Sequence, residues 1–329
     1  MNSAPAVVGL GEALLRLSAP GHRRLDRVDT LEVDIGGAEM NTLIGVAALG
    51  GRAIWVTRLP DSPLGRRISG HASAYGVELV VGWNPDARAP LYFVEHGVPP
   101  RPSEVLYDRD DTPMRRLAAN DFDWPAIVNA TDAAYCTGIT CSLGDGPRAA
   151  VAAFLQAARG LGKQTAFDLN YRGKLWSWEQ AVACLRELLP DVSILFASAH
   201  DLHVLFDSPD ADPVDLARGV IKEFGPRLVV VRETATVAGC ELTSTVTAVT
   251  DADVVSGGTY ESFMVDAFGA GDAASAAFLT LWLRGETLSE ACDAAAWACA
   301  FQHTIPGDAW QVRAADLTGR AAPLRRILR

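Results

Sequence analysis

A glycine-rich turn that ends in an acid lies toward the C-terminal end of the chain. The run Asp266-Ala-Phe-Gly-Ala-Gly-Asp272 precedes an alanine-rich segment that predicts a strong helix over residues 273–283. The two glycines lack side chains, so the backbone N–H groups there can approach an oxyanion, and the helix N-terminus adds positive partial charge. These amides belong to Gly269, Ala270 and Gly271.

The acid at the end of this turn could act as a base beside the anion site. Asp272 falls in the first turn of the predicted helix, beside the place where the amides would hold a phosphoryl group. A carboxylate there can accept the proton of an attacking hydroxyl. The pattern therefore indicates phosphoryl transfer with Asp272 as the catalytic base.

Two other interpretations of the turn are weighed against this one. The first is a tight turn with a favourable first-turn acid and no ligand. The second is a dinucleotide site, because residues 269–274 fit G-x-G-x-x-A. A dinucleotide site needs a following strand that ends in an acid, and here a second helix is predicted instead. The Walker pattern of P-loop proteins is absent from the sequence.

Short apolar segments alternate with amphipathic ones along most of the chain. This alternation predicts an α/β fold, doubly wound, with a mostly parallel central sheet and helices on both faces. Strands are predicted at 6–10, 53–57, 133–137, 165–169, 193–197, 228–232 and 263–265. Helices are predicted at 40–49, 64–75, 147–160, 178–189, 214–224, 273–283 and 288–303.

Two stretches interrupt this rhythm, at about 14–34 and 89–111. Within the second, residues 91–95 and 104–107 are predicted as strands of a small antiparallel sheet. Neither stretch is long enough to fold independently. We therefore expect one domain over residues 1–329, with a β-lid that stands off the main sheet.

Composition narrows the class of partner and the compartment. The net charge of −11 disfavours nucleic acid and anionic membranes as partners. No apolar run approaches the roughly 20 residues of a membrane span, and the first residues do not resemble a signal peptide. A cytoplasmic protein is predicted, with its six scattered cysteines as free thiols.

Two separated motifs resemble those of the ribokinase-like PfkB carbohydrate kinases. The run 266–272 is similar to the C-terminal signature of that family, and Gly36-Gly-Ala-Glu-Met-Asn41, with 47–50 and 61–65, is similar to its N-terminal one. The resemblance implies a sugar kinase that uses ATP with Mg²⁺, with a monovalent cation as a further candidate cofactor. It also implies a homodimer formed through the lid.

Within the family, the chain is most similar to 2-keto-3-deoxygluconate kinases. The matching pieces are residues 91–93, 105–109, 168–172 and 303–308. The implied reaction phosphorylates the primary hydroxyl of this sugar acid. Two arginines suit its carboxylate because a guanidinium can bind a carboxylate through two hydrogen bonds. The candidate substrate-binding residues are Gly36, Gly37, Asn41, Tyr92, Tyr107, Arg109 and Arg172.

The nucleotide side departs from the family pattern. The usual Lys-x-Gly-x-x-Gly run reads Arg232-Glu-Thr-Ala-Thr-Val237, and the usual Asn-x-x-Glu reads Ser198-Ala-His-Asp201. Asp201 could still act on Mg²⁺ through water. By resemblance, the nucleotide-binding candidates are Asn170, Ser198, Arg232 and His303. Two alternatives stay open: a kinase for a neutral sugar such as ribose or fructose, and a weak or silent binder of sugar acids.

Overall fold

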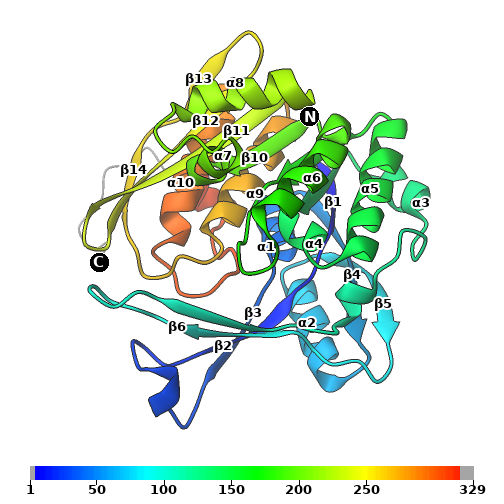
Figure 1. The fold of residues 1–329 in the computed structure, drawn as a ribbon, viewed down its shortest axis with the longest axis vertical. Coiled ribbons are helices and arrows are strands. Elements are labelled where there is room, and N and C mark those ends of the chain that lie inside the picture. Colours follow the sequence, from blue (N-terminus) through cyan, green and yellow to red (C-terminus); the bar gives the residue numbers. More distant parts are fainter. Residues whose placement is uncertain (1–3, 319–329) are drawn as a thin grey trace.

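The computed structural model describes residues 4–318, and in this part of the chain the strands form two sheets (Figure 1). The larger sheet has ten strands in the order β13-β12-β11-β10-β9-β8-β1-β4-β5, with β14 paired to β12. It is parallel from β5 to β11 and antiparallel beyond β11. Its strands are β1 (Ala6–Leu10), β4 (Arg52–Pro60), β5 (Glu78–Asn84), β8 (Ala133–Thr137), β9 (Gln164–Asp168), β10 (Ile194–Ser198), β11 (Leu228–Ala238), β12 (Glu241–Val249), β13 (Val254–Ser256) and β14 (Tyr260–Phe263).

Helices cover both faces of this sheet, as the alternating pattern predicts, and each face has its own apolar core. Along β1, Val7 packs into one core while Val8 and Leu10 pack into the other, because successive side chains point to opposite faces. The first core holds α1 (Ala38–Ala48), α2 (Pro63–Ala74), α9 (Ala270–Leu283), α10 (Leu288–Gln302) and α11 (Ala314–Thr318). The second holds α3 (Trp124–Asn129), α4 (Gly138–Cys141), α5 (Asp145–Gly160), α6 (Trp178–Leu188), α7 (Ala199–Leu205) and α8 (Pro213–Phe224).

The second sheet is the predicted lid, which lies below the main body in Figure 1. It contains β2 (Leu14–Ser18), β3 (Glu32–Gly36), β6 (Leu91–Glu95) and β7 (Glu104–Asp108), in the order β3-β2-β6-β7. The two strands predicted for the lid, β6 and β7, pair antiparallel as expected, whereas the central pair β2 and β6 runs parallel. Between these two strands the chain passes through β3, α1, β4, α2 and β5, and β6 then enters the lid in the same direction as β2.

Three local predictions differ from the structure. The strand expected at 263–265 lies at Tyr260–Phe263, where it pairs with β12. The helix expected to begin at residue 273 begins at Ala270, so the last residues of the turn already belong to α9. The strand expected to end at residue 232 runs on to Ala238, because β12 pairs with it over nearly its whole length.

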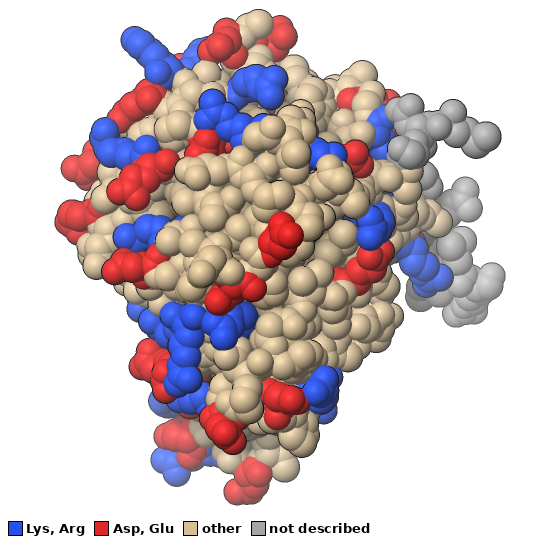
Figure 2. Space-filling view, turned by 90° about the vertical axis from the view of Figure 1, so that its right-hand side faces the viewer, with Lys and Arg blue, Asp and Glu red and all other residues tan. Residues whose placement is uncertain are grey.

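Other features concern the surface and the thiols. All six cysteines are free, as predicted. Among the described residues, no helix has both the length and the apolar character that a bilayer crossing requires. On the face that Figure 2 presents, acidic and basic side chains intermingle.

Candidate active site

A cleft of about 590 Å³ opens at the carboxyl ends of the parallel strands, and the lid contributes part of its lining. Ligands of open α/β sheets bind at this end of the strands. Every residue predicted for the site lines this cleft: Gly36, Gly37, Asn41, Tyr92, Tyr107, Arg109, Asn170, Arg172, Ser198, Asp201, Arg232, Gly269, Ala270, Gly271, Asp272 and His303.

The glycine-rich turn forms the N-terminus of α9. Gly269 caps the helix with a φ of +75°, a conformation that favours glycine. A Cβ atom at Gly269 would lie 2.2 Å from the carbonyl oxygen of Asp308, so the position also lacks room for a side chain. The amides at the start of the helix have no acceptor within it. They therefore offer hydrogen-bond donors to an anion in the cleft.

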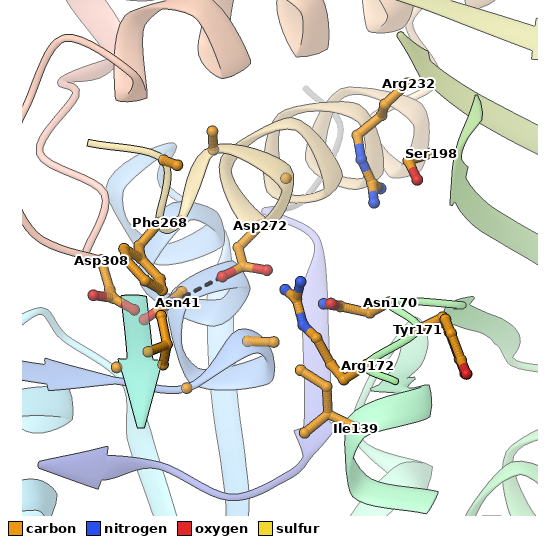
Figure 3. Close-up of a pocket in the computed structure, with 18 of the residues that line it drawn as sticks. Asn41, Ile139, Asn170, Tyr171, Arg172, Ser198, Arg232, Phe268, Asp272 and Asp308 are labelled. Atoms are coloured by element: carbon orange, nitrogen blue, oxygen red, sulfur yellow. Dashed lines mark hydrogen bonds between the residues drawn. The ribbon is translucent and has the colours of Figure 1, made fainter. Parts of the chain in front are cut away.

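Asp272, in the first turn of α9, lies at the centre of the cleft lining in Figure 3. Its Oδ2 atom accepts a hydrogen bond of 2.8 Å from Nδ2 of Asn41 in α1. Burial raises the pKa of Asp272 to about 7, although the bond from Asn41 and the charge of Arg172 act in the opposite direction. A carboxylate with such a pKa suits general-base catalysis near neutral pH.

The side of the cleft formed by the lid and α1 is the lid wall: Gly36, Gly37, Asn41, Tyr92, Tyr107 and Arg109. The hydroxyl of Tyr92 donates to Oδ2 of Asp308 at 2.9 Å, and a Cβ at Gly36 would lie 2.3 Å from the same oxygen. The Tyr107 ring, 36% exposed, stacks on that of Tyr92. Arg109 is buried and forms an ion pair with Glu12.

Arg172 differs from Arg109 in having no such partner. Its side chain forms no hydrogen bond or ion pair with another side chain in residues 4–318, and the residue is exposed. Figure 3 shows its guanidinium directed toward Asp272. Of these two arginines, Arg172 is therefore the one whose charge is available to a ligand.

The opposite side of the cleft is the strand wall: Ser198, Asp201, Arg232 and Thr234. Arg232 lies within β11, opposite Ser198 at the end of β10, and donates to Asp168 at 3.0 Å and to Ser275 at 3.2 Å. Ser198 caps α7, and Oδ2 of Asp201 accepts from both the amide and the hydroxyl of Ser198. Arg232 and Asp201 are thus held in place before any ligand binds.

Two remaining candidates lie at the edges of the strand wall. His303 follows α10, and its Nδ1 lies 3.3 Å from the carbonyl oxygen of Asp266. Its Nε2 lies 3.9 Å from the thiol of Cys299, which also lines the cleft. Asn170 follows β9 with a φ of +40°, a value uncommon outside glycine.

Comparison with known proteins identifies the family of the chain. The profile described as pfkB family carbohydrate kinase matches residues 5–309. The chain belongs to the pfkB family of carbohydrate kinases. It is therefore an enzyme that transfers a phosphoryl group to an alcohol of a carbohydrate, and the fold and the two motifs predicted from the sequence agree with this assignment.

Two similar proteins are named as kinases of 2-dehydro-3-deoxy sugar acids, and a third as a putative ribokinase. A 2-dehydro-3-deoxygalactonokinase of Haloferax volcanii is 35% identical over 302 residues, which cover 92% of each chain. The structure of a 2-dehydro-3-deoxygluconokinase of Thermotoga maritima is 29% identical, with a TM-score of 0.91 over 98% of this chain and 99% of that one. An Escherichia coli structure described as a putative ribokinase II in complex with ATP and Mg²⁺ shares the fold (TM-score 0.82, 19% identity, 96% and 98% covered).

Several cleft residues of this pfkB kinase were not predicted from the sequence. Glu12 and Asp308 line the cleft and bind the side chains of Arg109 and Tyr92, and Phe268 and Thr234 line it as well. Asp308 is the last residue of the segment 303–308, which resembles 2-keto-3-deoxygluconate kinases, so this resemblance could have identified it. Glu12 has only its place just after β1, which does not distinguish it from other polar residues in loops.

Proposed function

We propose that this kinase transfers the γ-phosphoryl group of Mg-ATP to the primary hydroxyl of a 2-keto-3-deoxy sugar acid (2-keto is the older name for 2-dehydro). The observation that carries the proposal is the group around Asp272: a carboxyl with a pKa of about 7, free helix amides and an unpaired Arg172 in one cleft. This group offers a base, an anion site and a cation for the acid.

The mechanism follows from these positions. The sugar hydroxyl loses its proton to Asp272 while its oxygen bonds to the γ-phosphorus, and the bond from that phosphorus to the β–γ bridging oxygen breaks, which releases ADP. The amides of Gly269, Ala270 and Gly271 stabilise charge on the transferring group. Mg²⁺ enters as part of the nucleotide substrate and neutralises phosphate charge; Asp201 would contact it, directly or through water.

The preference for an acid rests on Arg172. Arg109 already pairs with Glu12 in a buried site, so its charge is balanced within the protein. Arg172 has no such partner among the described residues, and a bound carboxylate would supply one. A neutral sugar would leave Arg172 with only the carboxyl of Asp272 as a nearby counter-charge, whereas a sugar acid adds a second one.

The test is ADP release from Mg-ATP with a panel of acceptors. The panel compares 2-keto-3-deoxygluconate and 2-keto-3-deoxygalactonate with ribose and fructose. We expect kcat/KM to be higher for the two acids by at least ~10-fold, because a charge-assisted hydrogen bond contributes roughly 1.5–3 kcal/mol. Equal or higher values for the neutral sugars would overturn the proposed substrate class.

The same panel addresses the silent alternative, which the altered run at 232–237 motivates. Calorimetry with a non-hydrolysable ATP analogue gives the answer directly. Binding of the acid without binding of the analogue, together with no ADP release, would indicate a non-catalytic binder. The preorganised Arg232 and Asp201 instead support nucleotide binding at the strand wall.

We also infer that the protein forms a homodimer through its lid. The lid exposes large apolar side chains, among them Leu106 (49% exposed) and Val33 (43% exposed), and Leu106 borders a hollow with Phe93 and Leu25. Apolar surface of this kind favours association. Light scattering of the wild type should give twice the chain mass and that of Leu106→Asp the single mass; a monomeric wild type would contradict this inference.

A further inference from the structure

One buried arginine of the lid lies outside the chemistry described so far. Arg16, in the central lid strand β2, is 2% exposed. Its guanidinium donates to Asp308 at 2.6 Å, to Asp266 at 2.7 Å and to Ser18 at 2.9 Å. It also lies 2.9 Å from Nε2 of His96 and 4.6 Å above the ring of Phe268. A single lid side chain thus reaches two carboxylates that belong to the main body.

The first of these carboxylates shapes the anion-binding turn. Asp266 begins the run that ends at Asp272, and its Oδ1 accepts from the amide of Phe268 at 3.1 Å. Its Oδ2 accepts from the amide of Gly307 at 3.0 Å. Asp266 therefore holds the turn closed and attaches it to the segment that follows α10.

The second carboxylate connects the turn with the sugar side. The backbone of Asp308 packs directly on Gly269, the cap of α9. Its side chain accepts from Tyr92 of the lid and lies against Gly36 at the end of β3. Any displacement of Asp308 would therefore move both the lid wall and the helix N-terminus that faces the phosphoryl group.

We propose that Arg16 is a positioning residue that couples the lid to the phosphoryl-transfer turn. This inference rests on the proposed function, because it assumes that the lid binds the sugar acid. One guanidinium forms ion pairs with two buried carboxylates, because its planar fork reaches both at once. Without it, Asp266 and Asp308 would repel each other, and the amides of α9 would shift relative to Asp272. A displacement of about 1 Å at a reacting centre can lower the rate by ~100-fold.

The decisive variant is Arg16→Lys, which keeps a cation but cannot donate to both carboxylates as a fork. We expect kcat to fall by ~10- to 100-fold while the KM for the sugar acid changes less. The matched control is Arg88→Lys, since Arg88 forms a half-exposed lid ion pair with Asp108. Its kinetics should stay within about twofold of wild type, as is usual for exposed ion pairs.

A second readout separates positioning from a merely structural role. Calorimetry measures the affinity of a non-hydrolysable ATP analogue with and without 2-keto-3-deoxygluconate. In the wild type we expect the sugar acid to change this affinity by at least ~5-fold, a typical coupling between linked sites. In Arg16→Lys the change should disappear. Should that variant fail to fold, Asp308→Asn tests the same link, because it removes one of the two carboxylates that Arg16 joins.

The outcomes distinguish this inference from the proposed function. A wild type that releases no ADP with any sugar acid would overturn the function itself. An active wild type whose sugar acid leaves the analogue affinity unchanged would overturn the coupling alone. So would an Arg16→Lys variant with a lower melting temperature but wild-type kcat and coupling.

Discussion

The two walls of the cleft are built differently. On the lid wall, three side chains are each held by a residue outside the wall: Asn41 by Asp272, Tyr92 by Asp308 and Arg109 by Glu12. On the strand wall, Arg232 is anchored, but the residues beyond it on β11 are partly or fully exposed, up to Val237 at 63%. This exposed part of β11 belongs to the run 232–237, which lacks the two glycines of the Lys-x-Gly-x-x-Gly pattern.

Under the proposed function, the difference follows from the ligand that each wall would recognise. A sugar acid is distinguished from other sugars by the placement of its hydroxyls and carboxylate, which requires fixed polar side chains. The phosphates of a nucleotide can be held largely by main-chain amides at a helix N-terminus, for which side-chain identity matters less. The strand wall can therefore diverge in sequence while the turn at 266–272 keeps its pattern.

The largest expected effect lies where the two walls meet. Asp272→Asn keeps the size of the side chain and can still bind Asn41, but it cannot accept the proton of the sugar hydroxyl. We expect kcat to fall by ~10²- to 10⁴-fold, the usual contribution of a general base. Steady-state ADP release measures this.

The matched control is Asp145→Asn. Asp145 is likewise an acid in the first turn of a helix, α5, but its side chain is fully exposed and outside the cleft. Its turnover should equal that of the wild type. Near-normal turnover in Asp272→Asn would show that proton transfer does not depend on this carboxylate.

How far the sequence predicts this site depends on how local each part is. Gly269 and Asp272 lie within one turn, so their spacing alone predicts an amide site with a base beside it. Arg16 and its partner Asp308 are separated by 292 residues, and no periodic pattern in either segment connects them. The charge balance of Arg109 by Glu12, 97 residues away, was unpredictable for the same reason.

The fold shows the same difference between features that are local in the sequence and features that depend on distant segments. Most of the parallel strands and their longer helices were predicted because each carries its own apolar pattern, whereas β5, α3, α4 and α7 were missed. The extension of β11 to Ala238 was missed, since polar residues such as Glu233 and Thr234 lack a buried face, and only the pairing with β12 makes them a strand. The parallel contact of β2 with β6 depends on the path of the whole chain between them.

The next largest effect is expected for one of two arginines, Arg172 and Arg109, at the sugar side of the cleft. Arg172→Met should raise the KM for the sugar acid by ~10- to 100-fold, because a charge-assisted hydrogen bond is lost. Arg109→Met should act mainly on stability, because it leaves Glu12 buried without its partner. Acceptor kinetics combined with thermal unfolding separate the two. A larger KM effect from Arg109→Met would reverse the assignment of the carboxylate site.

On the strand wall we expect a smaller effect. Arg232→Met should raise the KM for ATP by about 10-fold, through loss of a cation beside Gly271, and should change the KM for the sugar acid little. It should also lower the melting temperature, because it leaves Asp168 buried without its ion-pair partner. The control is Thr236→Ala, an exposed position of the same strand outside the cleft lining, which should alter the KM for ATP by less than ~3-fold. If Arg232→Met instead raised only the KM for the sugar acid, the two walls would have been assigned the wrong way round.

The smallest expected effect concerns stability: Asp272→Asn should increase the free energy of unfolding. Burial raises the pKa of Asp272 from its ordinary value of 3.8 to about 7. Between these values the folded protein binds more protons than the unfolded chain, so the free energy of unfolding falls as pH rises through this window. The charged carboxylate thus opposes folding most strongly above pH 7, and replacing it with a neutral amide removes that opposition.

Asp272→Asn should therefore raise the melting temperature more at pH 8 than at pH 5, by a few degrees, while Asp145→Asn changes it little at either pH. Calorimetric unfolding at the two pH values measures this without substrate. A variant that is less stable than the wild type at pH 8 would mean that the carboxylate is stabilised in the folded protein. Its pKa could then not be raised, and a base that functions near pH 7 would need another explanation. Stability and turnover of one variant thus test the same property of Asp272 by independent routes.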